Sequence, residues 1–187
     1  MLTYKHPKAK ACAVCERVFV PERMGQVVCR YVCGLKKARS DRMAAAQAEK
    51  ESVKRRKEAL KTIGQLIADA QEYFNAFIRQ RDKDKGCFVC GRPFTDKPGQ
   101  VQHAGHVRSR GAAGHLRFNE DNCHGECEGC NGPHGAKPHQ IKAGAIARIG
   151  LERFESLEND NTPHKWQRDE LIAIKATYRA KLKEMKK

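Results

Sequence analysis

Two cysteine pairs in the middle of the chain enclose residues of the types found in catalytic sites. The pairs are Cys87-x-x-Cys90 and Cys127-x-x-Cys130, with thirty-six residues between them. Four thiolates at this spacing are typical of a structural zinc site, in which the metal is held tetrahedrally. Side chains that can move a proton or bind a metal lie between and just after the pairs: His103, His106, Asn122, Asn131 and His134. The pattern predicts a zinc-stabilised segment that carries chemistry of its own.

A second set of cysteines lies near the N-terminus. Cys12-x-x-Cys15 and Cys29-x-x-x-Cys33 enclose thirteen residues, which is the size of a zinc ribbon or a small finger. Few apolar residues accompany these cysteines, so we expect zinc binding to supply most of the folding free energy of this module.

The charge of the chain points to a polyanionic partner. Lys and Arg number 37 against 22 Asp and Glu, which gives a net charge of +15. Such side chains replace the counterions condensed on nucleic acid, whereas an acidic membrane surface, or a basic protein with no nucleic-acid role, is the alternative. No apolar run approaches the roughly 20 residues of a membrane helix, and the start lacks the apolar core of a signal peptide. We therefore expect a cytoplasmic location, where nine cysteines serve as metal ligands and not as disulfides.

Charge and periodicity divide the chain into four expected segments. Residues 1–40 form the N-terminal four-cysteine module, and residues 41–86 form a long, basic and amphipathic helix. Residues 87–140 form the core with the second four-cysteine site, and residues 141–187 form C-terminal helices.

The long helix is predicted because residues 34–81 contain no proline and are rich in good helix formers. An apolar stripe recurs at steps of three and four residues, and Gly64 is the expected weak point. The stripe consists of Leu60, Ile63, Ile67, Ala70, Phe74 and Phe77. The helix is either a spacer or dimer arm, or a basic helix that grips DNA through Lys54, Arg55 and Arg56.

The C-terminal region repeats the helical pattern. Spacing from Ile141 to Leu151 predicts one helix, and Thr162-Pro163 predicts the start of another, with threonine as the cap and proline in the first turn. Apolar side chains of that last helix share one stripe: Trp166, Ile174, Tyr178 and Leu182.

Between the middle cysteine pairs, the pattern predicts a small α+β unit. Residues 99–107 predict a strand that enters a turn, residues 116–118 predict the returning strand, and a helix is expected to begin near Asn131. Two strands and a helix make the ββα-metal nuclease module, which needs a histidine to deprotonate water, an asparagine to hold it, and ligands for Mg²⁺. The expected fold is thus a small zinc-stabilised α+β protein with an N-terminal zinc ribbon or finger, a long helix, a ββα-metal (HNH-like) core and C-terminal helices.

Residues 103–131 resemble known nucleases. Residues 122–131 look like the end of an HNH endonuclease motif, in which an asparagine precedes Cys-x-x-Cys-His/Asn. Residues 103–122 are closer still to the NinG/Rap recombination proteins of lambdoid phages, which also have an N-terminal cysteine module. The resemblance implies structure-selective cleavage of branched intermediates such as Holliday junctions and D-loops, in the cytoplasm of a host bacterial cell.

The resemblance also implies roles for single residues. His106 matches the general base, Asn131 matches a ligand of the catalytic metal, and Asn122 matches the asparagine that orients backbone and base. HNH enzymes commonly place a metal-binding acid immediately before the base, whereas this chain has Gly105 there. His103 or His134 could substitute as ligands for Mg²⁺ or Mn²⁺.

Three arginines lie beside the expected base. Arg108, Arg110 and Arg117 fit phosphate contacts next to the scissile bond, since the guanidinium fork matches phosphate oxygens. Plain solvation of these side chains is the alternative. His106 could also replace a cysteine in the zinc site, although four thiolates are already available.

The function expected from these features is metal-dependent endonucleolytic hydrolysis of branched or double-stranded DNA. Two structural zinc ions and a catalytic Mg²⁺ or Mn²⁺ are the expected cofactors, and a homodimer would suit symmetric cleavage of a four-way junction. The main alternative is a two-zinc DNA-binding adaptor in recombination with no enzymatic activity. An RNA-binding protein is a third interpretation, but the chain lacks the aromatic stacking platforms typical of single-strand binding.

Overall fold

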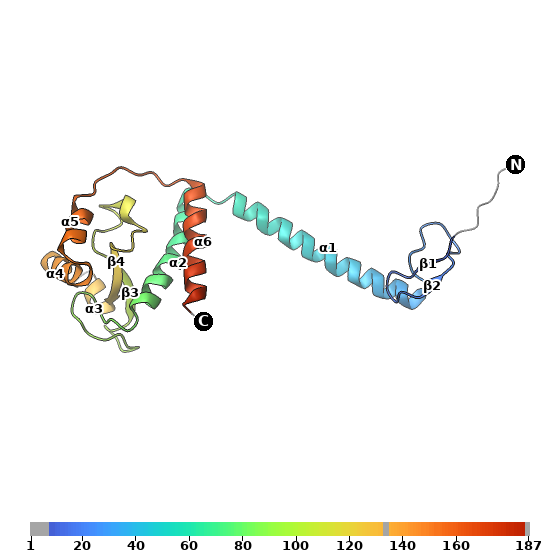
Figure 1. Cartoon of the computed structure of the whole chain (residues 1–187), viewed down its shortest axis with the longest axis horizontal. Helices are drawn as coiled ribbons and strands as arrows, with labels where there is room; N and C mark the ends of the chain where they lie inside the picture. Colours follow the sequence, from blue (N-terminus) through green and yellow to red (C-terminus); the bar gives the residue numbers. More distant parts are fainter. Residues whose placement is uncertain (1–7, 133–134, 186–187) are drawn as a thin grey trace. The chain divides into compact units, whose positions relative to one another are not determined.

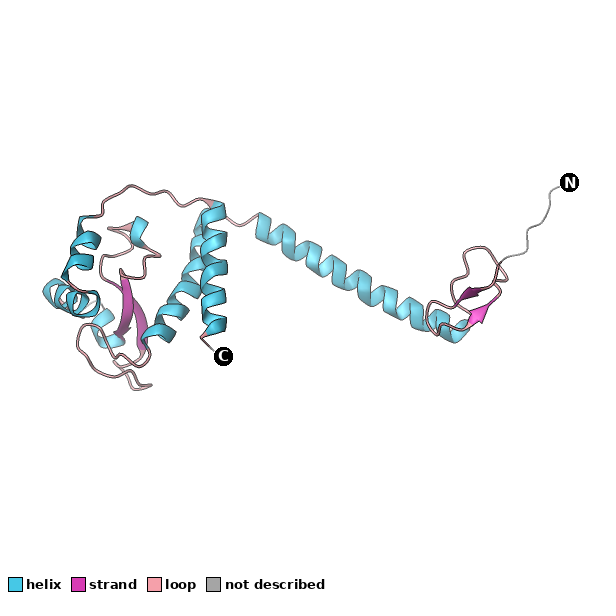
Figure 2. Ribbon diagram, viewed as in Figure 1, coloured by secondary structure: helices cyan, strands magenta, loops and turns pink. Residues whose placement is uncertain are grey.

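The computed structural model describes residues 8–132 and 135–185, which form two compact units that meet in sequence between Lys61 and Thr62 (Figure 1). Each unit combines helices with one two-stranded antiparallel sheet, so the expected mixture of helix and small sheet is confirmed (Figure 2). Within the described residues, none of the helices has the length and apolar character needed to span a bilayer.

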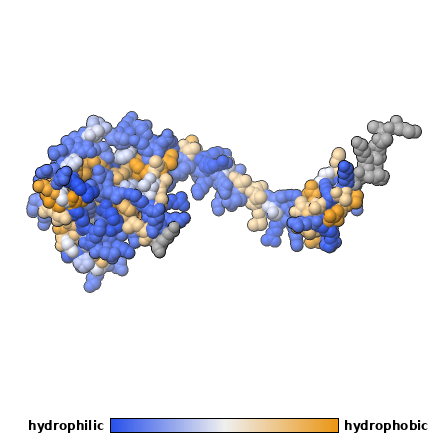
Figure 3. Space-filling model, viewed as in Figure 1, coloured by the Kyte–Doolittle hydropathy of each residue, from blue (hydrophilic) through white to orange (hydrophobic). Residues whose placement is uncertain are grey.

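The first unit consists of a short hairpin and one long helix. Strand β1 (Lys10–Ala11) pairs with β2 (Val18–Phe19), and the helix α1 covers Tyr31–Ala59. Cys33 is the one buried residue of α1, and the surface of this helix is largely hydrophilic (Figure 3). The unit therefore has almost no apolar core apart from its cysteines.

The helical region expected over residues 34–81 consists of two helices and not of one. Helix α1 ends at Ala59, and a new helix, α2, covers Ile63–Asp82. Thr62 caps α2 in a capping box with Gln65: its hydroxyl oxygen accepts from the Gln65 N–H at 3.3 Å, and the Gln65 side chain accepts from the Thr62 N–H at 2.8 Å. These bonds satisfy amide groups that a continuous helix would have used, so the break lies just before the expected weak point, Gly64.

The main core of the second unit lies along α2. Helix α6 (Arg168–Glu184) packs beside α2, and α2 also contacts both strands of the second sheet. The predicted stripe is buried at Ala70, Phe74 and Phe77, whereas Leu60 lies outside α2 and is exposed. The core residues are Leu66, Ala70, Phe74, Phe77, Ile78, Phe118, Cys123, Leu171 and Tyr178.

The second sheet is the hairpin of β3 (Gln102–His106) and β4 (Cys123–Cys127). The first strand was predicted, but the expected return strand at residues 116–118 was wrong. A 3-10 turn, η1 (Gly114–Leu116), lies there, and the chain returns later. All five residues of β4 are buried, including the polar His124 and Glu126, and its sequence Cys-His-Gly-Glu-Cys lacks the β-branched and aromatic residues that mark a strand.

Three helices follow β4. Helix α3 (Glu128–Asn131) ends where a helix was expected to begin, and α4 (Pro138–Ile149) and α5 (Leu151–Asn159) follow it. The single helix expected across residues 141–151 is divided at Gly150, whose φ of +85° lies outside the helical region.

The last helix begins later than predicted. Thr162-Pro163 does not start α6; Gln167 caps it in a capping box with Glu170. Trp166 therefore precedes the helix, yet its ring packs 5.0 Å from Phe118 and its indole N–H donates to the carbonyl of Gly114 at 3.1 Å. Trp166 therefore packs against the core from a loop position and not from the helical stripe expected for it.

Candidate functional site

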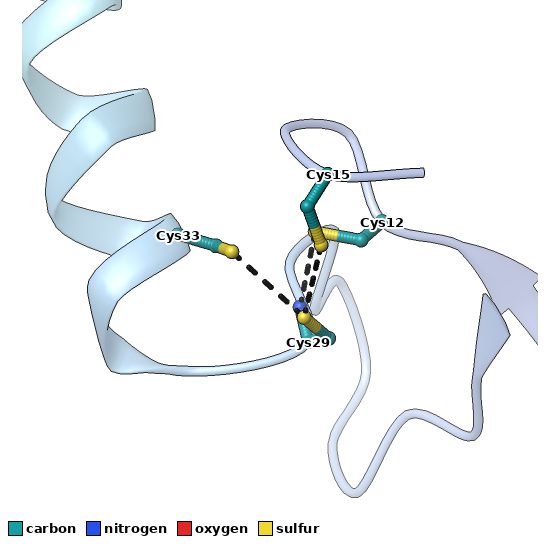
Figure 4. A group of neighbouring side chains, drawn as sticks. All are labelled: Cys12, Cys15, Cys29 and Cys33. Atoms are coloured by element: carbon teal, nitrogen blue, oxygen red, sulfur yellow. Dashed lines mark hydrogen bonds between the residues drawn. The ribbon is translucent and has the colours of Figure 1, made fainter. Parts of the chain in front are cut away.

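The four N-terminal cysteines point toward one another at the start of α1 (Figure 4). All four sulfur atoms lie within 4.8 Å of one another. Cys15 Sγ is 3.5 Å from Cys29 Sγ, which is 3.8 Å from Cys33 Sγ. Cys12 and Cys15 come from the turn after β1, and Cys33 lies in the first turn of α1. The convergence predicted from the spacing is confirmed, and this tetrad could hold zinc.

The second tetrad joins a turn at residues 87–92 to the end of the hairpin. Cys87, Cys90, Cys127 and Cys130 also place their sulfur atoms within 4.8 Å of one another. The Cys87 N–H donates to the carbonyl of Arg92 at 2.8 Å, so the turn presents both of its thiols on one side. Cys127 ends β4 and Cys130 lies in α3. A zinc ion bound here would fix the orientation of α3 and of its last residue, Asn131.

A hollow of about 370 Å³ brings four of the predicted site residues together: His103, His106, Arg110 and Asn131. Its walls include His103 and His106 from β3 and Asn131 from α3, with Arg79 from α2 and Arg110 from the loop after β3. Asn75, Ala104 and Ser109 complete the lining. Among the described residues, this lining contains two arginines, which can bind phosphate, and no carboxylate, so the lining itself offers a cation only the imidazoles, the amides and the Ser109 hydroxyl.

The protonation of His106 is fixed by the backbone. Its Nε2 lies 3.0 Å from the carbonyl oxygen of Arg117, and a carbonyl can only accept, so Nε2 carries the proton and Nδ1 holds the lone pair. Burial lowers the pKa of His106, and the positive charges of Arg110 and Arg117 lower it further against the opposing effect of that bond. The imidazole is therefore neutral at pH 7 and can accept a proton at Nδ1.

Cys123 is the closest polar neighbour of that nitrogen among the described contacts of His106. Its Sγ lies 3.8 Å from Nδ1. Burial raises the pKa of Cys123 to about 12, so the thiol stays protonated and does not take the proton that Nδ1 would accept. A thiol at this distance is at most a weak donor.

Asn122 is completely buried and holds the loop between the two strands. Its side-chain N–H groups donate to the carbonyls of Arg108 at 3.0 Å and Leu116 at 3.1 Å, and its oxygen accepts from the Arg108 N–H at 2.8 Å. Leu116 immediately precedes Arg117, whose carbonyl binds His106. Asn122 therefore positions the acceptor that orients the base, and it does not line the hollow.

The three arginines predicted as phosphate contacts divide into two kinds. Arg108 is used inside the protein, because its guanidinium donates to the carbonyls of Leu157 and Asp160 and to the Asn161 side chain. It is therefore a structural residue, not a phosphate contact. Arg110 is exposed in the wall of the hollow.

Arg117 lies on a second hollow, of about 400 Å³, that shares Asn75 and Arg110 with the first. It donates to Gln71 on α2 at 3.3 Å. Burial and the neighbouring Arg110 both lower the pKa of Arg117. Two like charges held this close favour an anion between or beside them.

Buried polar groups attach β4 to the end of α2. The fully buried Asp82 accepts from the Gly125 N–H at 2.9 Å and from Arg81, and these interactions hold its pKa well below the ordinary value against the effect of burial. Burial and the Arg81 charge lower the pKa of His124 to about 4. His124 is thus a neutral structural residue, which accepts from Arg81 and donates to the carbonyl of Asp121.

Glu126, the last but one residue of β4, is a buried carboxyl group that the sequence pattern did not single out. The residue is 4% exposed, and no hydrogen bond or ion pair of its side chain is found among the described residues. Burial, together with the nearby Cys90 thiol, raises the pKa of Glu126 to about 7.

The remaining predicted residues lie away from the hollow or outside the described residues. Lys54, Arg55 and Arg56 are exposed near the end of α1, where Arg56 pairs with Glu49 at 3.1 Å. His134 lies outside the described residues. Apart from the two cysteine tetrads, no group of three His, Cys, Asp or Glu side chains converges closely in the part of the chain that the structure describes.

Asn75 and Arg79 belong to the site but were not predicted. They lie one turn apart on α2, beside the apolar stripe that packs on the hairpin. Their spacing was visible in the sequence, but only the packing of α2 against β3 shows that this polar flank borders the hollow.

Comparison with known proteins identifies the family. The family model described as bacteriophage lambda NinG protein matches residues 4–187. The chain belongs to the NinG family. The protein ninG of Escherichia phage lambda is 35% identical, over 92% of this chain and 90% of the relative. The protein ninG of Escherichia phage 933W is 33% identical, over 96% of this chain and 95% of the relative. The protein ninG of Salmonella phage P22 is 35% identical, over 92% of this chain and 90% of the relative. No solved structure matches the chain. Membership in the NinG family confirms the family resemblance found in the sequence.

Proposed function

We propose that this NinG-family chain is a metal-dependent endonuclease that cleaves branched DNA such as Holliday junctions and D-loops. The observation that carries the proposal is the hollow in which His106, His103 and Asn131 meet two arginines. The order of β3, β4 and α3, with a cysteine tetrad at the end of the hairpin, agrees with an HNH-like ββα-metal module. The net charge of +15 supports a nucleic-acid substrate.

In this proposal, His106 is the general base. Its Nδ1 takes a proton from the water whose oxygen attacks the scissile phosphorus, while Nε2–H stays bound to the carbonyl of Arg117. The bond from phosphorus to the 3′ oxygen breaks, and that oxygen leaves with the electron pair. Asn122 contributes indirectly, because it fixes the loop that carries the carbonyl.

His103 and Asn131 would hold the divalent cation. They offer an imidazole nitrogen and an amide oxygen on the wall of the same hollow. Mg²⁺ keeps several water ligands and takes further oxygens from substrate phosphates, but it usually also takes one or two carboxylates, which this lining does not supply. When bound, the cation supplies neutralisation of the negative charge on the phosphate and on the leaving oxygen.

Arginines on two sides of the hollow would bind the DNA backbone. Arg110 and Arg79 face the same hollow as His106, and Arg117 extends this surface into the adjoining hollow. Lys54, Arg55 and Arg56 on α1 would add contacts to phosphates further from the scissile bond, since they are exposed. Two structural zinc ions, one in each tetrad, complete the proposed protein.

A cleavage assay with the zinc-loaded full chain tests this function. The substrates are linear, flapped and four-way DNA with Mg²⁺, and the variants are His106→Ala and, as a matched control, His139→Ala at an exposed position of α4. We expect His106→Ala to lose about a hundredfold or more in nicking rate, with zinc content and DNA binding kept. The control should nick like the wild type.

One result would count against the base and another against the nuclease. Equal cleavage by His106→Ala would remove the base assignment. A wild-type chain that binds branched DNA with two zinc ions but cleaves none of the substrates would be the non-enzymatic adaptor instead.

A further inference from the structure

A carboxylate from β4 occupies the space next to the residue that precedes His106. Gly105 has no side chain, and a Cβ added there would overlap with Glu126 Oε2 and lie 2.9 Å from both Cβ and Cδ of Glu126. Any other residue at position 105 would therefore displace this glutamate. The absence of a side chain at position 105 therefore leaves room for the Glu126 carboxylate.

Glu126 and His103 share one face of the hairpin. They stand directly opposite each other in the register of β3 and β4, and opposite residues of an antiparallel pair project to the same side. His103 lines the hollow that contains His106 and Asn131. The glutamate thus lies across the sheet from one predicted cation ligand and beside the backbone that carries the proposed base.

The carboxylate is buried but has no partner. Glu126 is 4% exposed, and no hydrogen bond or ion pair of its side chain occurs in residues 8–132 and 135–185. Among the described residues, every side-chain oxygen that is inaccessible to solvent has a hydrogen-bond partner. The Glu126 oxygens have no partner, so they must still be in contact with accessible space. The oxygens of Glu126 are therefore available to a ligand.

We propose that Glu126 is a ligand of a divalent cation, which it reaches from β4 in place of an acid at position 105. Mg²⁺ and Mn²⁺ prefer carboxylate oxygens, and one carboxylate with several waters is a common shell for Mg²⁺. His103 and Asn131 supply the other protein donors. This inference deepens the proposed nuclease function and rests on it.

The competing explanation is that Glu126 is an uncharged filler above Gly105. The two explanations differ in what glutamine would do at position 126. Glutamine has the same shape and would fill the space equally well, but its amide is a much poorer cation ligand than a carboxylate. Glu126→Gln therefore separates the two without removing the packing.

The test measures Mn²⁺ binding to the zinc-loaded full chain in the absence of DNA, by electron paramagnetic resonance of the free ion. The variants are Glu126→Gln, Glu126→Ala and the double variant Gly105→Asp with Glu126→Ala, which moves the carboxylate to the other strand. Glu128→Gln is the matched control, because it removes the same charge from an exposed position two residues away.

We expect the wild type to bind one Mn²⁺ beyond its zinc, and both single variants at position 126 to weaken binding by roughly ten- to a hundredfold. The double variant should recover most of the affinity, and Glu128→Gln should bind like the wild type. Zinc content and a thermal melt establish that each variant is folded. Recovery in the double variant would also exclude misfolding as the cause of the loss.

The outcomes for Glu126 and for the nuclease are distinguishable. Wild-type Mn²⁺ affinity in Glu126→Gln, or no Mn²⁺ site in the wild type, would overturn the assignment of Glu126. A chain that binds Mn²⁺ through Glu126 but never nicks DNA would retain the cation site and refute the nuclease. Unchanged nicking by Glu126→Gln would retain the nuclease and refute the role of Glu126.

Discussion

The imidazole of His106 donates from Nε2 to the carbonyl oxygen of Arg117, 3.0 Å away, so the proton position on the ring is set by a residue in the loop between β3 and β4. The same arginine contributes twice. Its carbonyl fixes the tautomer, and the positive charge of its side chain, with that of Arg110, adds to burial in lowering the pKa of His106. The ring is kept neutral and its Nδ1 keeps a lone pair.

This relationship predicts the acid side of the pH profile of cleavage. A base acts only when unprotonated, so activity falls as the pH drops through the pKa of His106, which lies below its ordinary value of 6.5. Arg110→Gln removes a positive charge, which raises that pKa, and the acid limb should move to higher pH. The measurement is the single-turnover nicking rate between pH 5 and pH 8.

The control for this prediction is Arg39→Gln, which removes the same charge from an exposed position on α1. Its midpoint should equal that of the wild type even if DNA binding weakens. If the acid limb of the pH profile does not shift in Arg110→Gln, a group other than His106 controls the pH dependence of nicking.

Asn122 should affect both stability and rate. Asn122→Ala removes three hydrogen bonds and takes the partner from the backbone N–H and carbonyl of Arg108, whereas the Leu116 carbonyl keeps its bond from the Asn119 N–H. We expect the free energy of unfolding to fall by about 3 kcal/mol, and kcat to fall more than KM changes, because the carbonyl that orients His106 loses its support. Thermal unfolding and nicking kinetics measure the two effects.

Asn119→Ala is the comparison for that variant, since the Asn119 side chain is exposed and accepts only from local turn N–H groups. Its cost should be about 1 kcal/mol or less. Similar losses in both variants would argue against the special position of Asn122.

Arg108 and Arg110 are close in sequence, but their variants should differ. Loss of Arg108 should lower stability, and loss of Arg110 should weaken DNA binding. Arg108→Ala breaks three bonds to residues 157–161 and should lower the free energy of unfolding by about 2 kcal/mol, with little change in the salt dependence of DNA binding. Arg110→Ala should leave stability within about 0.5 kcal/mol and reduce the salt slope by about one unit. Binding titrations at several salt concentrations, with melts of both variants, measure the contrast. The reverse pattern would reassign both arginines.

The cysteine tetrads and the buried stripe of α2 were predictable because their information is local. Ligand spacing such as Cys87-x-x-Cys90 fixes which thiols can meet, and a period of three to four residues places Phe74 and Phe77 on one helix face. The break at Thr62 was also encoded locally, since Thr62 and Gln65 form a capping box. Helix-forming residues on both sides of it concealed the signal.

The features that were missed depend on contacts between distant segments. Arg108 resembles a free phosphate contact in the sequence, and only the fold brings the carbonyl of Asp160 to its guanidinium. In the same way, Gly105 is a departure from the HNH pattern until β4 is placed opposite β3, which brings Glu126 over it. Strand β4 itself is short and contains no β-branched or aromatic residue, so its composition does not mark it as a strand.

Removing either zinc site should have a local and different effect. Cys15 and Cys90 are both exposed members of their tetrads, so Cys15→Ser and Cys90→Ser are matched changes. Each should lower the zinc released to a colorimetric chelator from two ions per chain to one. In the first unit little apart from cysteines is buried, so Cys15→Ser should unfold the hairpin at residues 10–19 and expose it to protease.

The second unit responds differently because it has a core that does not include the metal. Leu66, Phe74 and Tyr178 would keep α2 packed on α6 in Cys90→Ser, so most of this unit should remain protected from protease. Helix α3 has only four residues and depends on Cys127 and Cys130, and its release would displace Asn131 from the hollow. Cys90→Ser should therefore abolish nicking with a folded α2–α6 pair, while Cys15→Ser keeps nicking and weakens DNA binding. Full nicking activity in Cys90→Ser would show that the second tetrad is not needed to position Asn131 in the hollow.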